Sequence, residues 1–234
     1  MINKVRLDAW RKRWSRDERP KVERVLEGLD RSLPVLEAGC GYGAKLELLR
    51  SLGFTDLTGV EINPRAREAV RAKGFRVLSP DELAREGREY GLLVMAHVIE
   101  HFDWRDLLDF TDPYLERLAP GGRCLILAPL PHPLFHEDFD HVQPYFPQTI
   151  KVLFGEGDDQ TQAVSRHVLK LRDVYFRRSP FRRKTTRARL LKRGDAPDRM
   201  IDAGLALLFR ASFGVVGRRT GWIGLFEKKA SRSG

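Results

Sequence analysis

Cysteine is scarce in this sequence, and long apolar runs are absent from it. The two cysteines among 234 residues, Cys40 and Cys124, form no CxxC pair and have no histidine at a metal-ligand spacing. We therefore expect neither a disulfide framework nor a zinc site, and a reducing cytoplasm fits best. Residues 1–30 are polar and charged, so no secretory signal is expected. The longest apolar run, residues 203–216, contains Arg210 and is shorter than the roughly 20 residues that span a bilayer.

Basic residues are in excess and unevenly distributed. The formal net charge is +10. Residues 151–234 carry 20 Lys and Arg against 8 Asp and Glu, whereas residues 1–150 carry 22 against 24. Much of the excess lies in FRRSPFRRKTTRARLLKR, residues 176–193. Such a run can meet phosphates or an anionic lipid surface, and it can equally be a solvated surface, so both interpretations stay open.

Short apolar segments alternate with amphipathic segments along the chain. Apolar residues at helical spacing predict two short helices within residues 1–30. Further on, strands are expected at residues 34–38, 57–62, 75–78, 91–96, 123–129, 163–171 and 222–228, and helices at 44–52, 64–73, 81–86, 106–118, 147–153 and 196–213. This alternation is typical of an α/β fold with a doubly wound, mostly parallel, seven-stranded sheet and helices on both faces. We expect residues 31–234 to form one domain with a basic insertion around residues 174–195.

The segment VLEAGCGYGAKLELL, residues 35–49, joins a strand to a helix through a glycine turn. In doubly wound sheets, ligands bind outside the carboxyl ends of the strands. Gly39, Gly41 and Gly43 let the backbone approach a ligand without an intervening side chain. Glu61 ends the second strand, 22 residues after Gly39, where its two oxygens can bind ribose hydroxyls. Taken alone, these features also match a dinucleotide fingerprint.

Glu37 discriminates between two possible cofactors, NAD and S-adenosylmethionine. A carboxylate at this turn would repel the pyrophosphate of NAD and attract a cationic amino-acid group. Opposite charges at ~4 Å in a semi-buried site gain about 4 kcal/mol before desolvation. Glu37 therefore favours S-adenosylmethionine, and the alternative is an acid that only ends a strand.

Four motifs in order resemble the class I S-adenosylmethionine-dependent methyltransferases. They are LEAGCGYG (residues 36–43), LTGVEINP (57–64), MAHVIEHF (95–102) and LAPGGRCLILAP (118–129). More narrowly, VIEH at residues 98–101 is similar to the VLEH signature of the small-molecule branch that includes ubiquinone and sugar methyltransferases. The resemblance covers roughly residues 30–155 and implies a Rossmann-like fold and methyl transfer.

The resemblance also implies a set of cofactor contacts. These are Glu37, Gly39, Cys40, Gly41, Tyr42, Gly43, Glu61, Ile62, Asp81, Ala96 and His97. Glu37 and the glycine loop would hold the methionine end, with Ala96 and His97 near it. Glu61 would bind the ribose and Ile62 the adenine. Asp81 stands where the family often places an acid near the adenine amino group. The N-terminal helices, with Trp10 and Trp14, are a possible lid over the acceptor, or they pack as core.

Methyl transfer to a hydroxyl needs a general base, and histidine suits neutral pH. Five of the six histidines fall between the fourth strand and the loop after the fifth. We favour His101 or His141 as the base, with His136 next and Glu100 beside His101. The alternative is that Glu100 and His101 only brace the turn. No carboxylate stands at a persuasive metal-binding spacing from His132, His136 and His141, so no metal is expected.

Three functions remain in competition at this stage. We expect an S-adenosylmethionine-dependent methyltransferase that acts on a small-molecule or lipid-linked acceptor, most simply on oxygen. The basic last third makes an RNA methyltransferase the second hypothesis. The third is a membrane- or partner-binding protein that keeps the fold without catalysis, since an apolar helix lies beside the basic run. The sequence leaves the acceptor and the oligomeric state open.

Overall fold

The computed structural model describes residues 18–132, 135–155, 165–181 and 196–229. Trp10 and Trp14, the proposed lid residues, lie outside these ranges. Residues 18–25 form a helix, called helix 18–25 below. The apolar side chains at positions 22 and 25, and Leu26 directly after the helix, are buried, which confirms the predicted second N-terminal helix.

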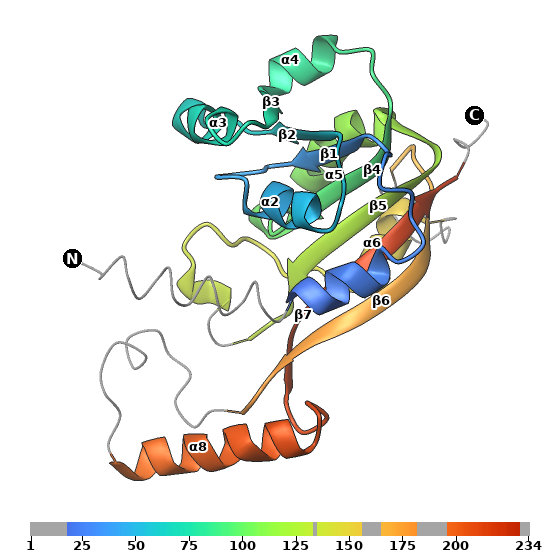
Figure 1. The fold of residues 1–234 in the computed structure, drawn as a ribbon. Helices are drawn as coiled ribbons and strands as arrows, with labels where there is room; N and C mark the ends of the chain where they lie inside the picture. The colour runs from blue at the N-terminus through green and yellow to red at the C-terminus, as the bar shows by residue number, and fades with distance from the viewer. Residues whose placement is uncertain (1–17, 133–134, 156–164, 182–195, 230–234) are drawn as a thin grey trace.

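Seven strands form a single sheet, in the order β3-β2-β1-β4-β5-β7-β6 (Figure 1). They are β1 (Val35–Ala38), β2 (Leu57–Val60), β3 (Arg76–Leu78), β4 (Tyr90–Ala96), β5 (Leu118–Pro129), β6 (Leu169–Ser179) and β7 (Arg218–Lys228). The pairs among β1 to β5 are parallel, and β7 lies antiparallel to both β5 and β6. The predicted fold class is confirmed.

Helices α2 (Ala44–Ser51), α3 (Pro64–Arg71), α4 (Pro80–Arg85), α5 (Trp104–Glu116) and α6 (Pro147–Phe154) cover the two faces of the sheet. Helix α8 (Ala196–Ala211) lies apart from these layers (Figure 1), and short 3₁₀ turns form η1 (Ile99–His101) and η2 (Phe135–Glu137). Side chains start several helices by binding free backbone N–H groups: the Asn63 carboxamide accepts from Arg65 N at 3.0 Å, and Ser79 and Glu82 form a capping box. Each cap fixes where a helix begins, and thus where the preceding loop ends.

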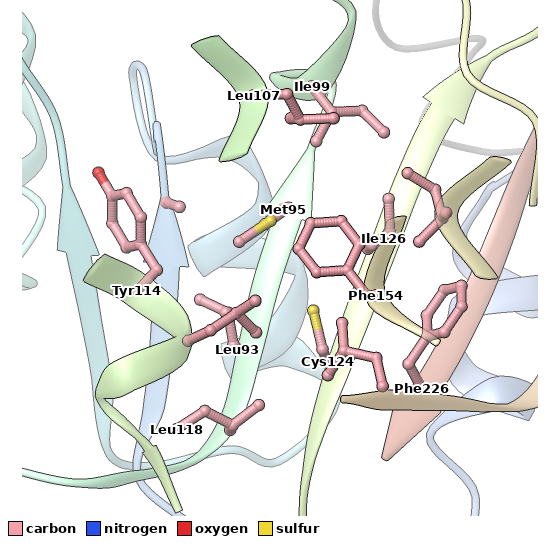
Figure 2. Close-up of a cluster of buried hydrophobic side chains, with 14 of the residues drawn as sticks. Leu93, Met95, Ile99, Leu107, Tyr114, Leu118, Cys124, Ile126, Phe154 and Phe226 are labelled. Carbon is pink, nitrogen blue, oxygen red and sulfur yellow. The ribbon is translucent and has the colours of Figure 1, made fainter. Parts of the chain in front are cut away.

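Two apolar clusters, one on each face of the sheet, form the core. One packs helix 18–25, α2 and α3 against the sheet. The other packs α4, α5 and α6 against the opposite face, with Met95 and Cys124 at its centre (Figure 2). Phe154 and Phe226 are fully buried within it. Burial at about 25 cal/mol per Å² of apolar surface makes these two layers the main source of stability.

The strand predicted at residues 163–171 is wrong in its position. Strand β6 begins at Leu169 and continues to Ser179, so residues 174–179 of the predicted insertion belong to the sheet. The misreading has a physical cause, because the strand is half-buried and carries charge on its covered face. Tyr175 packs under the Arg24 guanidinium, and Arg177 is only 4% exposed. Within the described ranges, no helix combines the length and the apolar character that a bilayer crossing requires.

Candidate active site

The site candidates gather where β1 and β4 end side by side. The chain leaves β1 towards β2 on one side of the sheet, and β4 starts the other side. This is the topological switch point, where doubly wound sheets bind their ligands. The loop after β1 contains residues 39–43, and the loop after β4 contains residues 97–101.

The glycine loop depends on backbone conformations that other residues rarely adopt. Gly39, Gly41 and Gly43 have φ of 68°, 51° and 81°. Gly43 starts α2 in the left-handed conformation, and a Cβ there would lie 3.2 Å from the Val70 side chain. The loop therefore needs glycine for its shape and, at Gly43, for its packing on α3.

Glu61 joins the two loops of the predicted nucleotide site. Its Oε2 accepts from Gly41 N at 2.8 Å, and its Oε1 accepts from Asn63 N at 2.8 Å. The carboxylate is thereby held in place, with remaining lone pairs for further donors. The neighbouring side chain of Ile62 is 79% exposed, so it is accessible to a ligand.

Glu37 is buried at the end of β1 with one oxygen unused. The residue is 2% exposed, and Oε2 has no hydrogen-bond partner among the described residues. Burial raises the pKa of Glu37 to about 8, Lys45 opposes this rise, and the charge of Glu61 adds to it. A buried acceptor without a donor is costly. The site thus fits a cationic or N–H-bearing group, such as the amino-acid end of S-adenosylmethionine.

The other predicted cofactor residues are placed as follows. Tyr42 is exposed in the glycine loop, and Ala96 ends β4. The Cys40 side chain is buried towards Gly59, where an added Cβ would lie 2.6 Å from its sulfur. Burial raises the pKa of Cys40 to about 12, so its thiol stays neutral. Asp81 is exposed in the first turn of α4.

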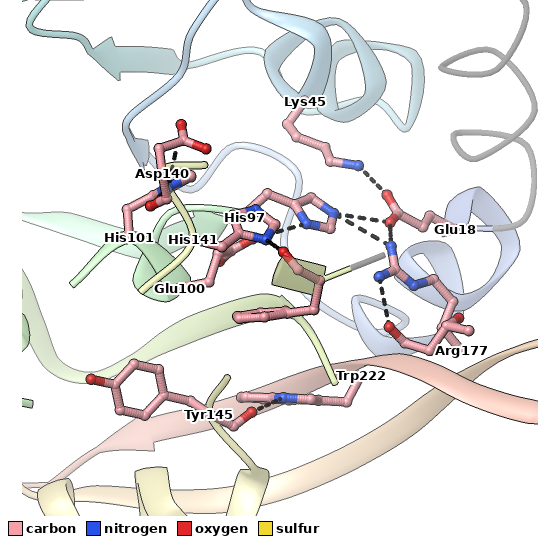
Figure 3. A network of polar contacts seen from close by, with 12 residues as sticks. Glu18, Lys45, His97, Glu100, His101, Asp140, His141, Tyr145, Arg177 and Trp222 are labelled. Atoms are coloured by element: carbon pink, nitrogen blue, oxygen red, sulfur yellow. Dashed lines mark hydrogen bonds and ion pairs between the residues drawn. The ribbon is translucent and has the colours of Figure 1, made fainter. Parts of the chain in front are cut away.

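A buried ionic cluster lies beside the loop and was missed in the sequence (Figure 3). The Glu18 carboxylate, 2% exposed, pairs with Lys45 of α2, with Arg177 of β6 and with His97. The Glu18 to His97 distance is 3.1 Å. Burial works to raise the pKa of Glu18, but these three partners together hold it well below its ordinary value. Nothing local in the sequence signals this pairing, because Glu18 and Arg177 are 159 positions apart.

His97 links this cluster to the loop after β4. Its backbone is in the left-handed region, with φ of 57°, which turns the side chain between two acids. Nε2 faces Glu18 at 3.1 Å and Nδ1 faces Glu100 at 3.4 Å. Burial alone would lower the pKa of His97, but the neighbouring carboxylates of Glu100 and Glu18 raise it above its ordinary value. The strain at a non-glycine residue marks a position held by function or by its partners.

Three of the four predicted catalytic residues meet in space. Glu100, His101 and His141 each offer a ligand atom within 4.8 Å of the other two. Glu100 is 1% exposed, and the two imidazole rings lie 5.2 Å apart at 60°. The fourth, His136, is exposed and stands edge-on to Phe135 at 5.0 Å.

Hydrogen bonds orient both imidazoles of this group. His101 Nδ1 lies 3.0 Å from the Asp140 carbonyl oxygen, and His141 Nδ1 lies 3.0 Å from the Phe135 carbonyl oxygen. A carbonyl only accepts, so each Nδ1 carries the proton and each Nε2 keeps its lone pair. A carboxylate with two such rings could hold a metal ion or a substrate proton. The expected absence of a metal stays a prediction.

The family follows from a direct comparison. A family model described as "Methyltransferase domain" matches residues 9–158. The chain belongs to this methyltransferase family. It is accordingly an enzyme that uses S-adenosylmethionine, as the glycine loop and Glu37 predict. No curated protein sequence matches the chain.

Several solved structures are similar to the chain in fold. A SAM-dependent methyltransferase from Archaeoglobus fulgidus is 21% identical with a TM-score of 0.53, over 89% of this chain and 94% of that chain. The N-methyltransferase NodS from Bradyrhizobium japonicum, in complex with S-adenosyl-L-homocysteine, is 17% identical with a TM-score of 0.55, over 92% and 87%. A third structure is described as "Conversion of a Disulfide Bond into a Thioacetal Group during Echinomycin Biosynthesis". It is 18% identical with a TM-score of 0.54, over 89% of this chain and 81% of that chain. Because the sequence identities are this low, these similarities show only that the methyltransferase shares their fold.

Proposed function

We propose that the methyltransferase methylates a hydroxyl group of a small or lipid-linked molecule, and that His101 is the general base. The observation that carries the assignment is the double contact of His101 Nδ1. This atom faces the Asp140 carbonyl oxygen at 3.0 Å and the Asp140 carboxylate at 3.6 Å. A carboxylate behind an imidazole orients the ring and stabilises the imidazolium that forms when the other nitrogen takes a proton.

His141 is the alternative base within the same group. Its Nδ1 contacts the Phe135 carbonyl oxygen and, among the described residues, forms no ion pair with a carboxylate, so its imidazolium has less support than that of His101. His136, the third candidate, is exposed, so it has no fixed approach to a bound acceptor. The buried Glu100 stands between the loop backbone and His97, where it adds negative potential that favours a protonated imidazole nearby.

The cofactor contacts are part of the same proposal. Glu37 and the glycine loop would bind the methionine end, and Glu61 would bind the ribose. Ile62 and Asp81 would contact the adenine, and Ala96 and His97 the methionine portion. Support comes from the unused oxygen of Glu37, the fixed carboxylate of Glu61 and the exposed side chain of Ile62.

The chemistry divides between the cofactor and the chain. S-adenosylmethionine supplies a methyl group on a sulfonium, whose carbon–sulfur bond breaks with both electrons left on sulfur. The chain aligns the acceptor oxygen, and oriented reactants supply about 7–11 kcal/mol of a barrier in favourable cases. His101 takes the hydroxyl proton as the carbon–oxygen bond forms, so the oxygen gains a methyl group and loses its proton.

A two-part experiment tests this proposal. Methyl transfer from tritiated S-adenosylmethionine is followed into a small-molecule extract, a lipid extract and total RNA. We expect label in one of the first two fractions. Label in RNA alone would refute the acceptor class and favour the nucleic-acid hypothesis, which should then show a steep loss of RNA affinity with salt.

Variants identify the base on the labelled fraction. His101→Asn should lower the transfer rate by about 10²–10⁴-fold, while calorimetry shows S-adenosylhomocysteine binding within a few-fold of the parent. His136→Asn is the matched control with an exposed ring. A larger rate loss in His141→Asn than in His101→Asn moves the role of base to His141, and an unchanged rate in both variants overturns the general-base mechanism.

A further inference from the structure

Large apolar side chains gather on α8 and on the turn that follows it. Figure 1 shows α8 beyond the ends of β6 and β7, away from the layered part of the fold. Seven of the 13 large hydrophobic residues that are exposed in the described ranges lie between positions 200 and 216. The most exposed are Met200, Leu207, Phe213 and Val215, at 76%, 69%, 97% and 69%. A contiguous apolar surface of this kind usually has a partner.

The pattern of α8 is the inverse of an ordinary surface helix. At about 100° per residue, Met200, Leu207 and Leu208 share one stripe, and the stripe is exposed. The opposite side carries Asp198, which is buried, and Phe209, which is partly buried. A helix that only covers the body of a protein turns its apolar stripe inward. Here the stripe faces outward, so packing within the described residues does not explain it.

The turn after α8 is built to present an aromatic ring. Phe213 has φ of 51°, a strained conformation for a residue with a side chain, and its ring is 97% exposed. Gly214 and Gly217 close the turn on Phe209, where an added Cβ at Gly217 would lie 2.7 Å from that ring. Arg178 donates to the Val215 carbonyl oxygen at 2.8 Å. The turn is therefore fixed from behind while Phe213 stays in solvent.

Arginines flank this apolar surface. Arg210, in the last turn of α8, and Arg219, at the start of β7, are both exposed. Arg219 lies over the Phe176 ring at 4.4 Å, which keeps its charge near the turn. The acidic side chains of α8 lie on the other side of the helix, with Asp198 buried and Asp202 partly buried. The exposed side is thus apolar with a basic edge.

We propose that α8 and the 212–216 turn dock on the interface of an anionic lipid bilayer. An amphipathic helix with exposed leucine, a protruding phenylalanine and arginines at its edge matches the features that seat a helix among lipid headgroups. A convex helix suits a soft plane better than a shaped pocket. A second copy of the chain fits less well, because a two-fold contact through the stripe would bring the arginines of both copies together. The surface is independent of the identity of the catalytic base.

Vesicle sedimentation of the full chain tests the proposal. The probes are phosphatidylcholine vesicles and phosphatidylcholine vesicles with added phosphatidylglycerol, each at low and high salt. We expect binding to the anionic vesicles at low salt and a clear loss at high salt. Equal failure to bind either vesicle overturns the proposal. Failure to bind together with a dimer in size-exclusion chromatography assigns the surface to a second copy.

Matched variants locate the contact. Phe213→Ser and the double variant Leu207→Ser/Leu208→Ser should each reduce the vesicle partition coefficient at least about tenfold, because each removes apolar area from the interface. Neutralising Arg210 and Arg219 together should reduce it about 25-fold, at about fivefold for each arginine. Phe139→Ser is the control, since Phe139 is also fully exposed but lies outside the surface. Equal loss in the control and in Phe213→Ser contradicts the placement. Circular dichroism with unchanged melting separates a docking effect from unfolding.

Discussion

Side chains near the candidate site are held in place by different interactions in the β1 to β4 region and in the last third of the chain. Between β1 and β4, backbone conformation and hydrogen bonds between near neighbours hold the groups. Glu61 is fixed by backbone N–H groups of Gly41 and Asn63, both within 20 positions of it. Arg177 of β6 reaches its place through an ion pair with a residue 159 positions away.

The contrast concerns which interactions a short sequence segment can specify. Glycines at positive φ and a polar cap encode a loop wherever they occur in order. A buried ion pair between distant segments needs the whole sheet to be formed first, and each partner alone is costly to bury. The locally encoded loop should tolerate changes elsewhere in the chain, whereas the long-range ion pair should be sensitive to them.

The largest effect should come from Glu18→Gln, which removes the centre of the ionic cluster. Arg177, only 4% exposed, then loses its ion pair with the Glu18 carboxylate. We expect the free energy of unfolding to fall by about 3–5 kcal/mol in urea titrations at neutral pH. Because the pKa of Glu18 is lowered in the folded state, its contribution is present above its ordinary pKa and is lost as the pH falls. The difference between parent and variant should therefore shrink in acid.

Two comparisons keep this prediction open to refutation. Glu23→Gln, an exposed change on the same helix, should cost under about 0.5 kcal/mol. Replacing both charges, as in Glu18→Leu/Arg177→Met, should restore part of the loss, because the charge of the buried Arg177 is then removed while Lys45 and His97 still lose the Glu18 carboxylate. A double variant as unstable as the sum of the single variants contradicts the pairing.

Gly43→Val should act next in size and in the other region. Valine would have to adopt φ of 81° with its Cβ 3.2 Å from Val70. Strain and overpacking together should cost about 2–4 kcal/mol, and calorimetry should detect no S-adenosylmethionine binding. Gly74→Val is the matched control, with φ of 78° in open space. It should lose some stability and keep its affinity for the cofactor.

These two variants also mark what the sequence could predict. Alternating apolar and helical segments were enough to place β1 to β5, β7 and the helices of the described residues, because the burial of these elements follows a local period. The glycine turn and Glu61 were predicted from local sequence as well, because glycines between a strand and a helix and an acid at the end of the next strand are recognisable in order. Strand β6 was displaced in the prediction because its buried Arg177 looks like a surface charge until Glu18 is known to face it.

The proposed catalytic group of Glu100, His101 and His141 was only partly predictable from the sequence. Glu100 and His101 form a recognisable motif, but His141 joins them through the fold of a proline-rich loop, whose backbone N–H groups at positions 142 and 143 donate to the Glu100 carbonyl oxygen. The ligand atoms come within 4.8 Å only as a result. The spacing of these three residues along the chain does not predict that their side chains meet.

A smaller effect should appear in the pH dependence of cofactor binding. Burial raises the pKa of Glu37 to about 8. If Glu37 binds the cationic end of S-adenosylmethionine, binding favours the ionised carboxylate and releases a proton. The affinity should then rise by up to about tenfold per pH unit, or about 1.4 kcal/mol, between about pH 6 and pH 8. Calorimetry in buffers of different ionisation enthalpy measures the proton release.

Glu37→Gln separates this titration from other groups. The variant keeps the shape and loses the charge, so its affinity should be weaker and nearly flat over the same pH range. Lys45 contributes charge to both Glu37 and Glu18, so Lys45→Met should raise the pKa inferred for Glu37. An unchanged pH dependence in Glu37→Gln assigns the titration elsewhere and removes the main argument for this cofactor contact.

The smallest effect should come from Asp103→Ala at the start of α5. The Asp103 carboxylate accepts from Arg105 N at 2.8 Å and from Asp106 N at 3.1 Å, and both donors are local. Losing this cap should cost about 1 kcal/mol of unfolding free energy and leave cofactor affinity unchanged. Asp103→Asn, which keeps an acceptor, should recover most of that loss. A loss of unfolding free energy as large as that of Glu18→Gln would mean that a local cap matters as much as the long-range ion pair. The difference between the two regions would then not hold.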